Sequence, residues 1–151
     1  MLSDNKHNIK AALSQFRFPS DLTRVRQVSH EVLDRLKDLH LNSSVLFDIR
    51  LCFEEAFINA VKYGNKKNPN LTVDVDIKTD KDVVEIIVRD YGEGFDSSRY
   101  ADPSKDKNLA KPGGKGVYLI KKLMDEAVYK DGGRCLHMKK FIKRLEGQDN
   151  S

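Results

Sequence analysis

Tryptophan is absent from this sequence of 151 residues, cysteine is scarce, and no apolar run is long. The two cysteines, Cys52 and Cys135, have neither the spacing of a metal site nor that of a disulfide framework. No stretch approaches the ~18 apolar residues that span a bilayer, and residues 1–10 lack the apolar core of a secretory signal. These absences exclude a secreted miniprotein, a zinc finger and a transporter, and they favour a cytoplasmic protein with no membrane partner.

The remaining composition fits one globular domain, because natural domains contain roughly 150 residues. Hydrophobic residues make up 39% of the chain and charged residues 33%, which is polar but not typical of disorder. We expect an N-terminal tail over residues 1–14, a single domain over residues 15–145 and a C-terminal tail over residues 146–151.

Apolar periodicity predicts the element order β-α-α-β-β-loop-α-β-β. Antiparallel hairpins with helices grouped between them indicate an α+β fold, a two-layer sandwich in which about three helices cover one face of a mostly antiparallel sheet. The expected strands are residues 15–18, 71–78, 83–89, 127–130 and 134–142, and the expected helices are residues 21–39, 45–63 and 114–124.

Positive charge gathers between residues 97 and 122, where seven Lys and Arg face two Asp. This local charge of +5 exceeds the +4 of the whole chain.

Much of this positive charge lies in residues 90–113, an unusually long segment without periodicity, and such loops are often functional. A basic segment of this kind favours a phosphate-bearing ligand, although a solvated lysine loop would look the same. The basic residues 139–144 are more typical of a solvated final strand, so no direct nucleic-acid partner is expected.

Glu55 and Asn59 are four residues apart and therefore share one face of the second predicted helix. An asparagine offers a hard neutral oxygen to Mg²⁺. A glutamate kept free of the metal could accept a proton from an attacking hydroxyl. The alternative for this segment alone is an ordinary helix with a polar stripe.

Two glycine-containing segments could complete a nucleotide site. Asp90 follows a strand and could accept a hydrogen bond from an exocyclic amine such as that of adenine, while Gly92 and Gly94 permit close approach to a flat ring. The glycines around Lys115 open a helix, whose free N–H groups can bind phosphate. A plain turn and a flexible cap are the respective alternatives. The chain lacks a Walker A pattern, a dinucleotide fingerprint and the ordinary protein-kinase signatures.

Together, Glu55-x-x-x-Asn59, Asp90-x-Gly92-x-Gly94 and Gly114-x-Gly116 resemble, in order and spacing, the N, G1 and G2 boxes of the GHKL (Bergerat-fold) ATPases. Within these, the chain is most similar to the anti-sigma-factor serine kinases of the RsbW-like family, over about residues 15–143. The resemblance implies ATP and Mg²⁺ as cofactors, Glu55 as the catalytic base, Asn59 as the metal ligand and residues 96–113 as the ATP lid. It implies nucleotide binding by Asn59, Lys62, Tyr63, Asp90, Gly92, Gly94, Phe95, Lys111, Gly113, Gly114, Lys115, Gly116 and Val117.

The same resemblance implies the partners. Members of the family phosphorylate a STAS-domain anti-sigma-factor antagonist on serine, hold a sigma factor and usually form homodimers. The alternative is an ATP-binding GHKL module that regulates partners without phosphotransfer. A histidine-kinase output domain is disfavoured, because His30 lies only 29 residues before Asn59, which leaves no room for a dimerisation helix pair.

Overall fold

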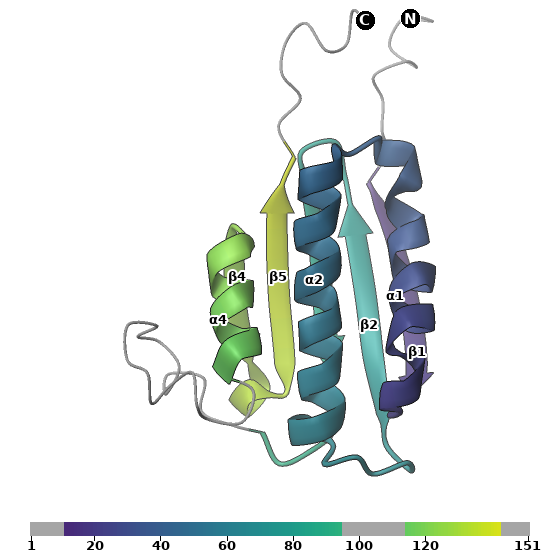
Figure 1. Ribbon diagram of the computed structural model, residues 1–151, viewed down its shortest axis with the longest axis vertical. Coiled ribbons are helices and arrows are strands. Elements are labelled where there is room, and N and C mark those ends of the chain that lie inside the picture. Colours follow the sequence, from purple (N-terminus) through teal and green to yellow (C-terminus); the bar gives the residue numbers. More distant parts are fainter. Residues whose placement is uncertain (1–10, 95–113, 143–151) are drawn as a thin grey trace, which may run out of the picture.

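Five antiparallel strands form one sheet in the order β1-β2-β3-β5-β4, and in Figure 1 this sheet lies behind the helices α1, α2 and α4. The computed structural model describes residues 11–94 and 114–142. The strands are β1 (Ala12–Pro19), β2 (Thr72–Thr79), β3 (Val83–Arg89), β4 (Glu126–Lys130) and β5 (Cys135–Phe141). The helices are η2 (Leu22–Arg24), α1 (Val25–Leu33), η3 (Asp34–Leu39), α2 (Ser43–Asn59), η4 (Ala60–Gly64), α4 (Gly114–Leu123) and η6 (Asp131–Gly133).

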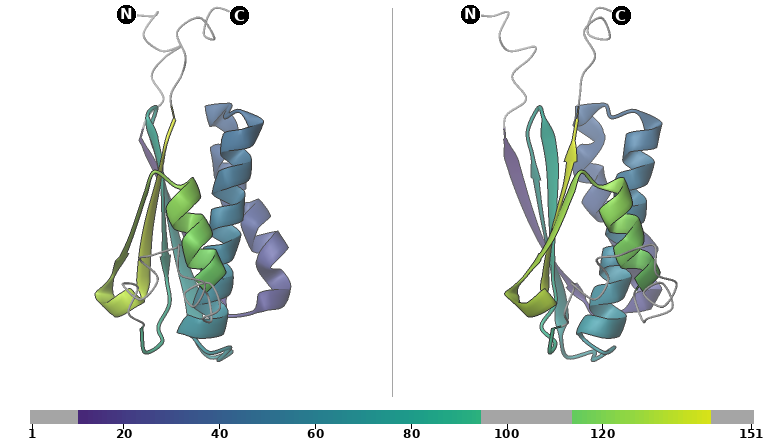
Figure 2. Two further views of the ribbon diagram at one scale, coloured as in Figure 1. Left: turned by 60° about the vertical axis from the view of Figure 1, so that its left-hand side comes forward. Right: turned by 90° about the vertical axis from the view of Figure 1, so that its left-hand side faces the viewer.

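The helices α1, α2 and α4 lie on the same face of the sheet, which the two side views show clearly (Figure 2). The core fills the space between these two layers. Strand β2 alternates as predicted and buries Val73, Val75 and Ile77, while α2 contributes Phe53 and Phe57 from the other side. Each fully buried side chain of this size contributes about 1.5–3 kcal/mol. The predicted two-layer α+β sandwich is confirmed.

The first helix departs from the prediction of a single helix over residues 21–39. It is divided into a 3₁₀ turn, η2, the short α-helix α1 and a 3₁₀ segment, η3. The three-residue spacing of the buried Leu36 and Leu39 suits a 3₁₀ helix, in which side chains at i and i+3 eclipse. His40 then ends the segment with a left-handed backbone (φ 50°).

Two further boundaries differ from the prediction. Strand β1 begins at Ala12, so residues 12–14, which we expected in the N-terminal tail, pair with β2 instead. The second helix was expected to continue regularly to Tyr63, but the α-helix ends at Asn59 and one π-helical turn follows. Such turns are rare, and they are frequently found at functional sites.

Polar side chains cap η2 and α2 at their amino-terminal ends. The Asp21 carboxylate accepts hydrogen bonds from the backbone N–H (2.9 Å) and hydroxyl (2.8 Å) of Thr23. The Asn42 side chain accepts the backbone N–H of Val45 at 2.9 Å, which caps α2. Both contacts satisfy N–H groups that the helix itself leaves unpaired.

Strand order decides what lies beside the end of β3. The last strand, β5, is inserted between β3 and β4, and Arg89 pairs with Cys135 in this register. The next residues outward are therefore Asp90 and Arg134, and the Asp90 N–H donates to the Arg134 carbonyl at 2.8 Å. The turn before β5 is thus held against the loop that follows β3.

Candidate functional site

The amino-terminal turn of α4 packs directly on the predicted polar face of α2. Gly116 is buried at this contact, and a Cβ there would lie 2.8 Å from Glu55 Oε2 and 2.9 Å from Asn59 Nδ2. These distances are shorter than real Cβ contacts, so the glycine permits the close approach. The first and third predicted segments therefore meet, although 57 positions separate Asn59 from Gly116.

The second segment joins them through the π-helical turn η4. The Asn65 N–H donates to the Ala60 carbonyl at 2.7 Å, five residues back, as a π-turn requires. This turn presents Gly64 to Asp90, and a Cβ at Gly64 would overlap the Asp90 carboxylate. Gly92 is similarly restricted, because a Cβ there would overlap the Gly64 carbonyl oxygen. All three segments thus converge on α2 and its continuation.

Asp90 is a nearly buried acceptor at the end of β3, with only 6% of its surface exposed. Burial raises the pKa of its carboxyl group, although the Gly92 N–H bond and the positive charges of Arg134 and Arg89 oppose this effect. Its Oδ1 accepts the Gly92 N–H at 3.0 Å, which fixes the carboxylate in place. A fixed, buried carboxylate can select a ligand that donates a hydrogen bond.

Asn65 connects this loop to the rest of the domain, a role that the sequence alone does not indicate. Its side-chain amide donates to the Thr72 carbonyl at 2.9 Å and to Ser20 Oγ at 3.2 Å. Its Oδ1 accepts the Tyr91 N–H at 2.9 Å. Gly and Asn are common just after the end of a helix. The sequence therefore indicated a helix end at this position, but not the hydrogen bonds that Asn65 makes to three other segments.

Arg134 is a second positioning residue that the sequence did not reveal. Its guanidinium donates to the carbonyls of Gly92 (2.8 Å), Glu93 (3.0 Å) and Asp131 (3.0 Å). Gly94 has a φ of 85° and lies so near the turn that a Cβ would overlap the Gly132 carbonyl. These contacts hold residues 92–94 against η6.

Tyr91 anchors the outer side of the same loop. Its hydroxyl donates to the carboxylate of Asp74, which also accepts two hydrogen bonds of 3.0 Å from Arg17. Burial alone would raise the pKa of Asp74, but hydrogen bonds from Arg17, Tyr91 and Thr72 outweigh it, and the pKa lies below its ordinary value. Asp90 is therefore flanked by anchored residues.

The remaining predicted binding residues lie in η4, in α4 or outside the described residues. Lys62 and Tyr63 belong to η4, and the Lys62 ammonium lies 5.4 Å from the centre of the Tyr63 ring. In α4, Gly114 and Val117 are buried, whereas Lys115 is exposed. Phe95, Lys111, Gly113 and the lid over residues 96–113 lie outside the described residues.

The donor set near Asn59 bears on metal binding. Within residues 11–94 and 114–142, no three His, Cys, Asp or Glu side chains gather into a metal cage. Glu55 and Asn59 instead offer a carboxylate and an amide within reach of the same glycine. A carboxylate or amide oxygen that shares a cation with phosphate is the usual arrangement for Mg²⁺.

Both cysteines are buried. Burial raises the pKa of Cys52 to about 12 and raises that of Cys135 as well. A thiol with a raised pKa contributes little thiolate at neutral pH, so both act as packing residues. In the part of the chain that the structure describes, no helix has the length and hydrophobicity needed to cross a membrane.

Comparison with known proteins gives one consistent result. A family model described as "Histidine kinase-like ATPase domain" matches residues 18–140. Proteins named "Serine-protein kinase RsbW" from Staphylococcus aureus strains JH9, Newman and USA300 are each 34% identical to this chain over 111 residues. Each alignment covers 68% of this chain and 70% of the relative.

Proposed function

The chain belongs to the histidine kinase-like ATPase domain family, in its RsbW-like branch, and from this membership we propose that it is an ATP-dependent serine/threonine-protein kinase. Its substrate would be a STAS-domain anti-sigma-factor antagonist, phosphorylated on serine. The observation that supports the proposal is the convergence on α2. Gly116 of α4 packs against Glu55 and Asn59, and Gly64 in the π-helical turn η4 packs against Asp90.

Nucleotide recognition follows from the two ends of this arrangement. At one end the fixed Asp90 carboxylate would accept a hydrogen bond from the adenine amine, and the glycines at 92 and 94 let the loop that carries Asp90 pack against Gly64 and Gly132. At the other end Gly114 and Gly116 present the start of α4 to the phosphates, where N–H groups and the helix dipole favour anions. The exposed Lys115 adds a positive charge, and Lys62 and Tyr63 border the site.

Asn59 would hold Mg²⁺ through its side-chain oxygen. The amide fits this role because it is neutral, close to Glu55 and on a rigid helix that positions it. When bound, the ion neutralises charge that develops on the phosphates during transfer. Asn59 already makes a contact within the protein, so binding of the ion would replace that contact.

Glu55 would act as the base. As the serine hydroxyl attacks, its oxygen forms a bond to the γ-phosphorus, and the bond from that phosphorus to the bridging oxygen of ADP breaks. The hydroxyl proton moves to the Glu55 carboxylate, and ADP keeps the electron pair of the broken bond. Because little covalent chemistry is left to the protein, positioning and charge neutralisation supply most of the acceleration.

The biological setting is a partner switch. The kinase would act in the cytoplasm as a homodimer and sequester a sigma factor. An unphosphorylated antagonist would compete for the kinase and so release the sigma factor. Phosphorylation of the antagonist would then restore sequestration. The names of the RsbW relatives support kinase activity, and the choice of partners follows the resemblance of the three boxes.

Transfer of the labelled γ-phosphate of ATP to a purified STAS-domain antagonist tests the proposal. We expect Glu55→Gln to reduce transfer by about 10²–10⁴-fold while ATP still binds. Asn59→Ala should weaken Mg-ATP binding, and Asp90→Asn should reduce selectivity for adenine over guanine nucleotides. Glu31→Gln, an exposed change on α1, is the matched control. ATP binding without labelling of the antagonist would instead identify a regulatory module without phosphotransfer.

A further inference from the structure

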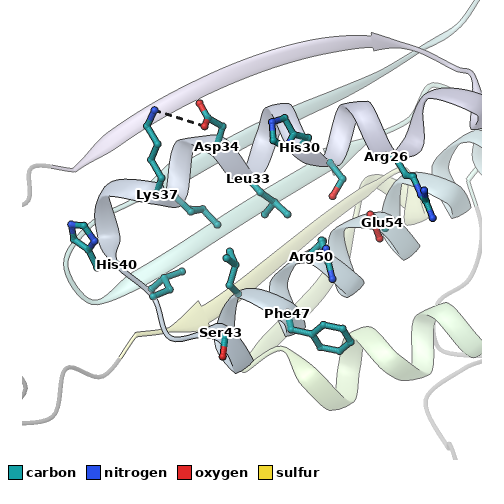
Figure 3. A pocket seen from close by; sticks show the side chains of 14 residues that line it. Arg26, His30, Leu33, Asp34, Lys37, His40, Ser43, Phe47, Arg50 and Glu54 are labelled. Atoms are coloured by element: carbon teal, nitrogen blue, oxygen red, sulfur yellow. Dashed lines mark ion pairs between the residues drawn. The ribbon is translucent and has the colours of Figure 1, made fainter.

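A second concave surface lies on the helix layer, away from the convergence on α2. It is a groove of about 1070 Å³ between α1 with η3 on one side and the first half of α2 on the other (Figure 3). Arg26 and Glu54 lie at one end of it, and Lys37 and His40 lie at the other. We call this surface the α1–α2 groove.

A buried hydroxyl without a partner lines the α1–α2 groove. Ser29 is only 2% exposed, and its Oγ has no hydrogen-bond partner among the described residues. Buried hydroxyls are normally satisfied, and one that is not requires an explanation. A ligand in the groove that carries an acceptor or donor would satisfy it.

The sides of the groove expose apolar surface. Leu46 and Phe47 on α2 are 38% and 52% exposed, although both are large hydrophobic residues. Leu33 faces them from α1, and Leu36 lies buried at the base. Contiguous exposed apolar residues in a depression with a polar border are typical of interaction sites.

Unpaired cations border this apolar surface near Ser29. No ion pair joins Arg26 or Arg50 to a carboxylate within the parts of the chain that the structure describes. The Arg50 guanidinium lies 5.7 Å from the centre of the Phe47 ring instead. Further along, Lys37 is paired with Asp34 at 3.8 Å. The negative charge of Glu54 balances only one of the two arginines, so this end of the groove carries a net positive charge.

We propose that the α1–α2 groove is a docking site for an amphipathic, acidic helix of a partner protein. The apolar residues of the partner helix would cover Leu46 and Phe47. One of its carboxylates would lie between Arg26 and Arg50 and accept a hydrogen bond from the Ser29 hydroxyl. The shape supports a helix, because two neighbouring helices offer a third one a continuous groove. Residues 26–33 rise about 1.5 Å each and the 3₁₀ residues 34–39 about 2.0 Å each, so this side of the groove is about 24 Å long, which is enough for about four helical turns.

Fluorescence anisotropy with two labelled peptides of 20 residues tests this proposal on the full chain. Both peptides carry leucine at helical spacing, flanked in one by glutamate and in the other by lysine. We expect the acidic peptide to bind saturably and the basic peptide to bind at least about tenfold more weakly. Phe47→Ala should weaken binding of the acidic peptide about tenfold.

Charge reversal makes the test specific. The double variant Arg26→Glu/Arg50→Glu should lose the acidic peptide and bind the basic one better than the original chain does. Lys130→Glu, an exposed change on β4, should alter neither affinity. Circular dichroism and thermal midpoints verify that each variant is folded.

Three results would overturn the proposal. The first is no saturable binding of the acidic peptide at millimolar concentration, and the second is equal binding of both peptides. The third is a change in oligomeric state caused by Phe47→Ala in sedimentation, since the groove would then be occupied by a second copy of the chain. None of these results depends on ATP or phosphotransfer, so they are independent of the proposed kinase activity.

Discussion

The helix α2 has two flanks that differ in how they are covered. Toward α4, the contact is so close that a Cβ at Gly116 would displace the side-chain ends of Glu55 and Asn59. Toward α1, the helices leave a groove of about 1070 Å³ with an unpartnered hydroxyl and exposed Phe47 at its border. One helix thus presents a tightly fitted surface and an incompletely filled one.

This difference separates two ways in which a protein surface can serve binding. On the closed flank, small residues let backbones approach, so polar side chains are held at fixed positions without strain. On the open flank, large residues stand apart, and polar groups remain unsatisfied until something enters. Substitutions on the closed flank should therefore disturb geometry more than stability, whereas on the open flank they should change stability and docking in opposite directions.

The largest effect is expected from Gly116→Ala on the closed flank. The new methyl group would displace the ends of the Glu55 and Asn59 side chains, and a misplacement of about 1 Å can reduce catalysis about 100-fold. Unfolding free energy should stay constant or rise by up to ~1 kcal/mol, because alanine is the better helix former. Phosphotransfer assays beside denaturant unfolding measure both, with Lys121→Ala on the exposed side of α4 as the control. An active variant would show that the close contact is irrelevant to function.

The next largest effect is expected from Arg134→Gln, which acts on the loop beside the closed flank. The Gly92 and Glu93 carbonyls would lose their guanidinium donors, which costs about 1–3 kcal/mol of stability. Amide hydrogen exchange should accelerate at residues 91–93, and ATP affinity should fall. Arg89→Gln is the control, because its ion pair with Asp131 is largely exposed and such pairs contribute only ~0–1 kcal/mol. Equal effects of the two changes would contradict a special role for Arg134.

On the open flank, Ser29→Ala should stabilise the protein by about 1 kcal/mol, because it removes a buried hydroxyl that has no partner. Thermal or denaturant unfolding measures this gain, and Ser43→Ala, an exposed change, should stay within ±0.5 kcal/mol of the original chain. Ser29→Ala should also bind the acidic peptide more weakly than the original chain does. A loss of stability would mean that the hydroxyl is already satisfied, and the contrast between the flanks would disappear.

The smallest effect is expected from the titration of Asp90. Burial raises its pKa above the ordinary value of 3.8, so the folded state favours the protonated carboxyl. The wild-type protein should therefore lose stability as the pH rises from about 3.8 through the raised pKa. The positive charges of Arg134 and Arg89 reduce this loss. Asp90→Asn does not titrate, so its stability relative to wild type should increase over that interval, as urea unfolding at several pH values would show.

The sequence predicted what depends on local pattern. The apolar periodicity that predicted a strand over residues 71–78 and a helix over residues 45–63 corresponds to β2 and α2. The three boxes were identified by residue type and spacing, and the structure brings their described members together. Their individual roles stay predictions, because binding and transfer depend on a ligand.

What the sequence could not reveal depends on long-range register. Arg134 reaches the loop after β3 only because β5 pairs with β3, and no local pattern specifies which strand pairs with which. The π-turn at η4 depends on the fit of Gly64 against Asp90, contributed by segments 26 positions apart. The α1–α2 groove likewise depends on the distance between two helices that periodicity alone predicts to pack together.

The position of β5 inside the sheet has a consequence for biosynthesis. Because the last strand pairs with both β3 and β4, the nascent chain cannot complete its sheet until residue 141 has left the ribosome. Until then β3 exposes an unpaired edge of valine and isoleucine, which is a template for aggregation. A ribosome that stalls just before residue 135 would therefore hold a chain in which β1, β2 and β3 can pair, but in which the loop after β3 lacks its contacts with Arg134.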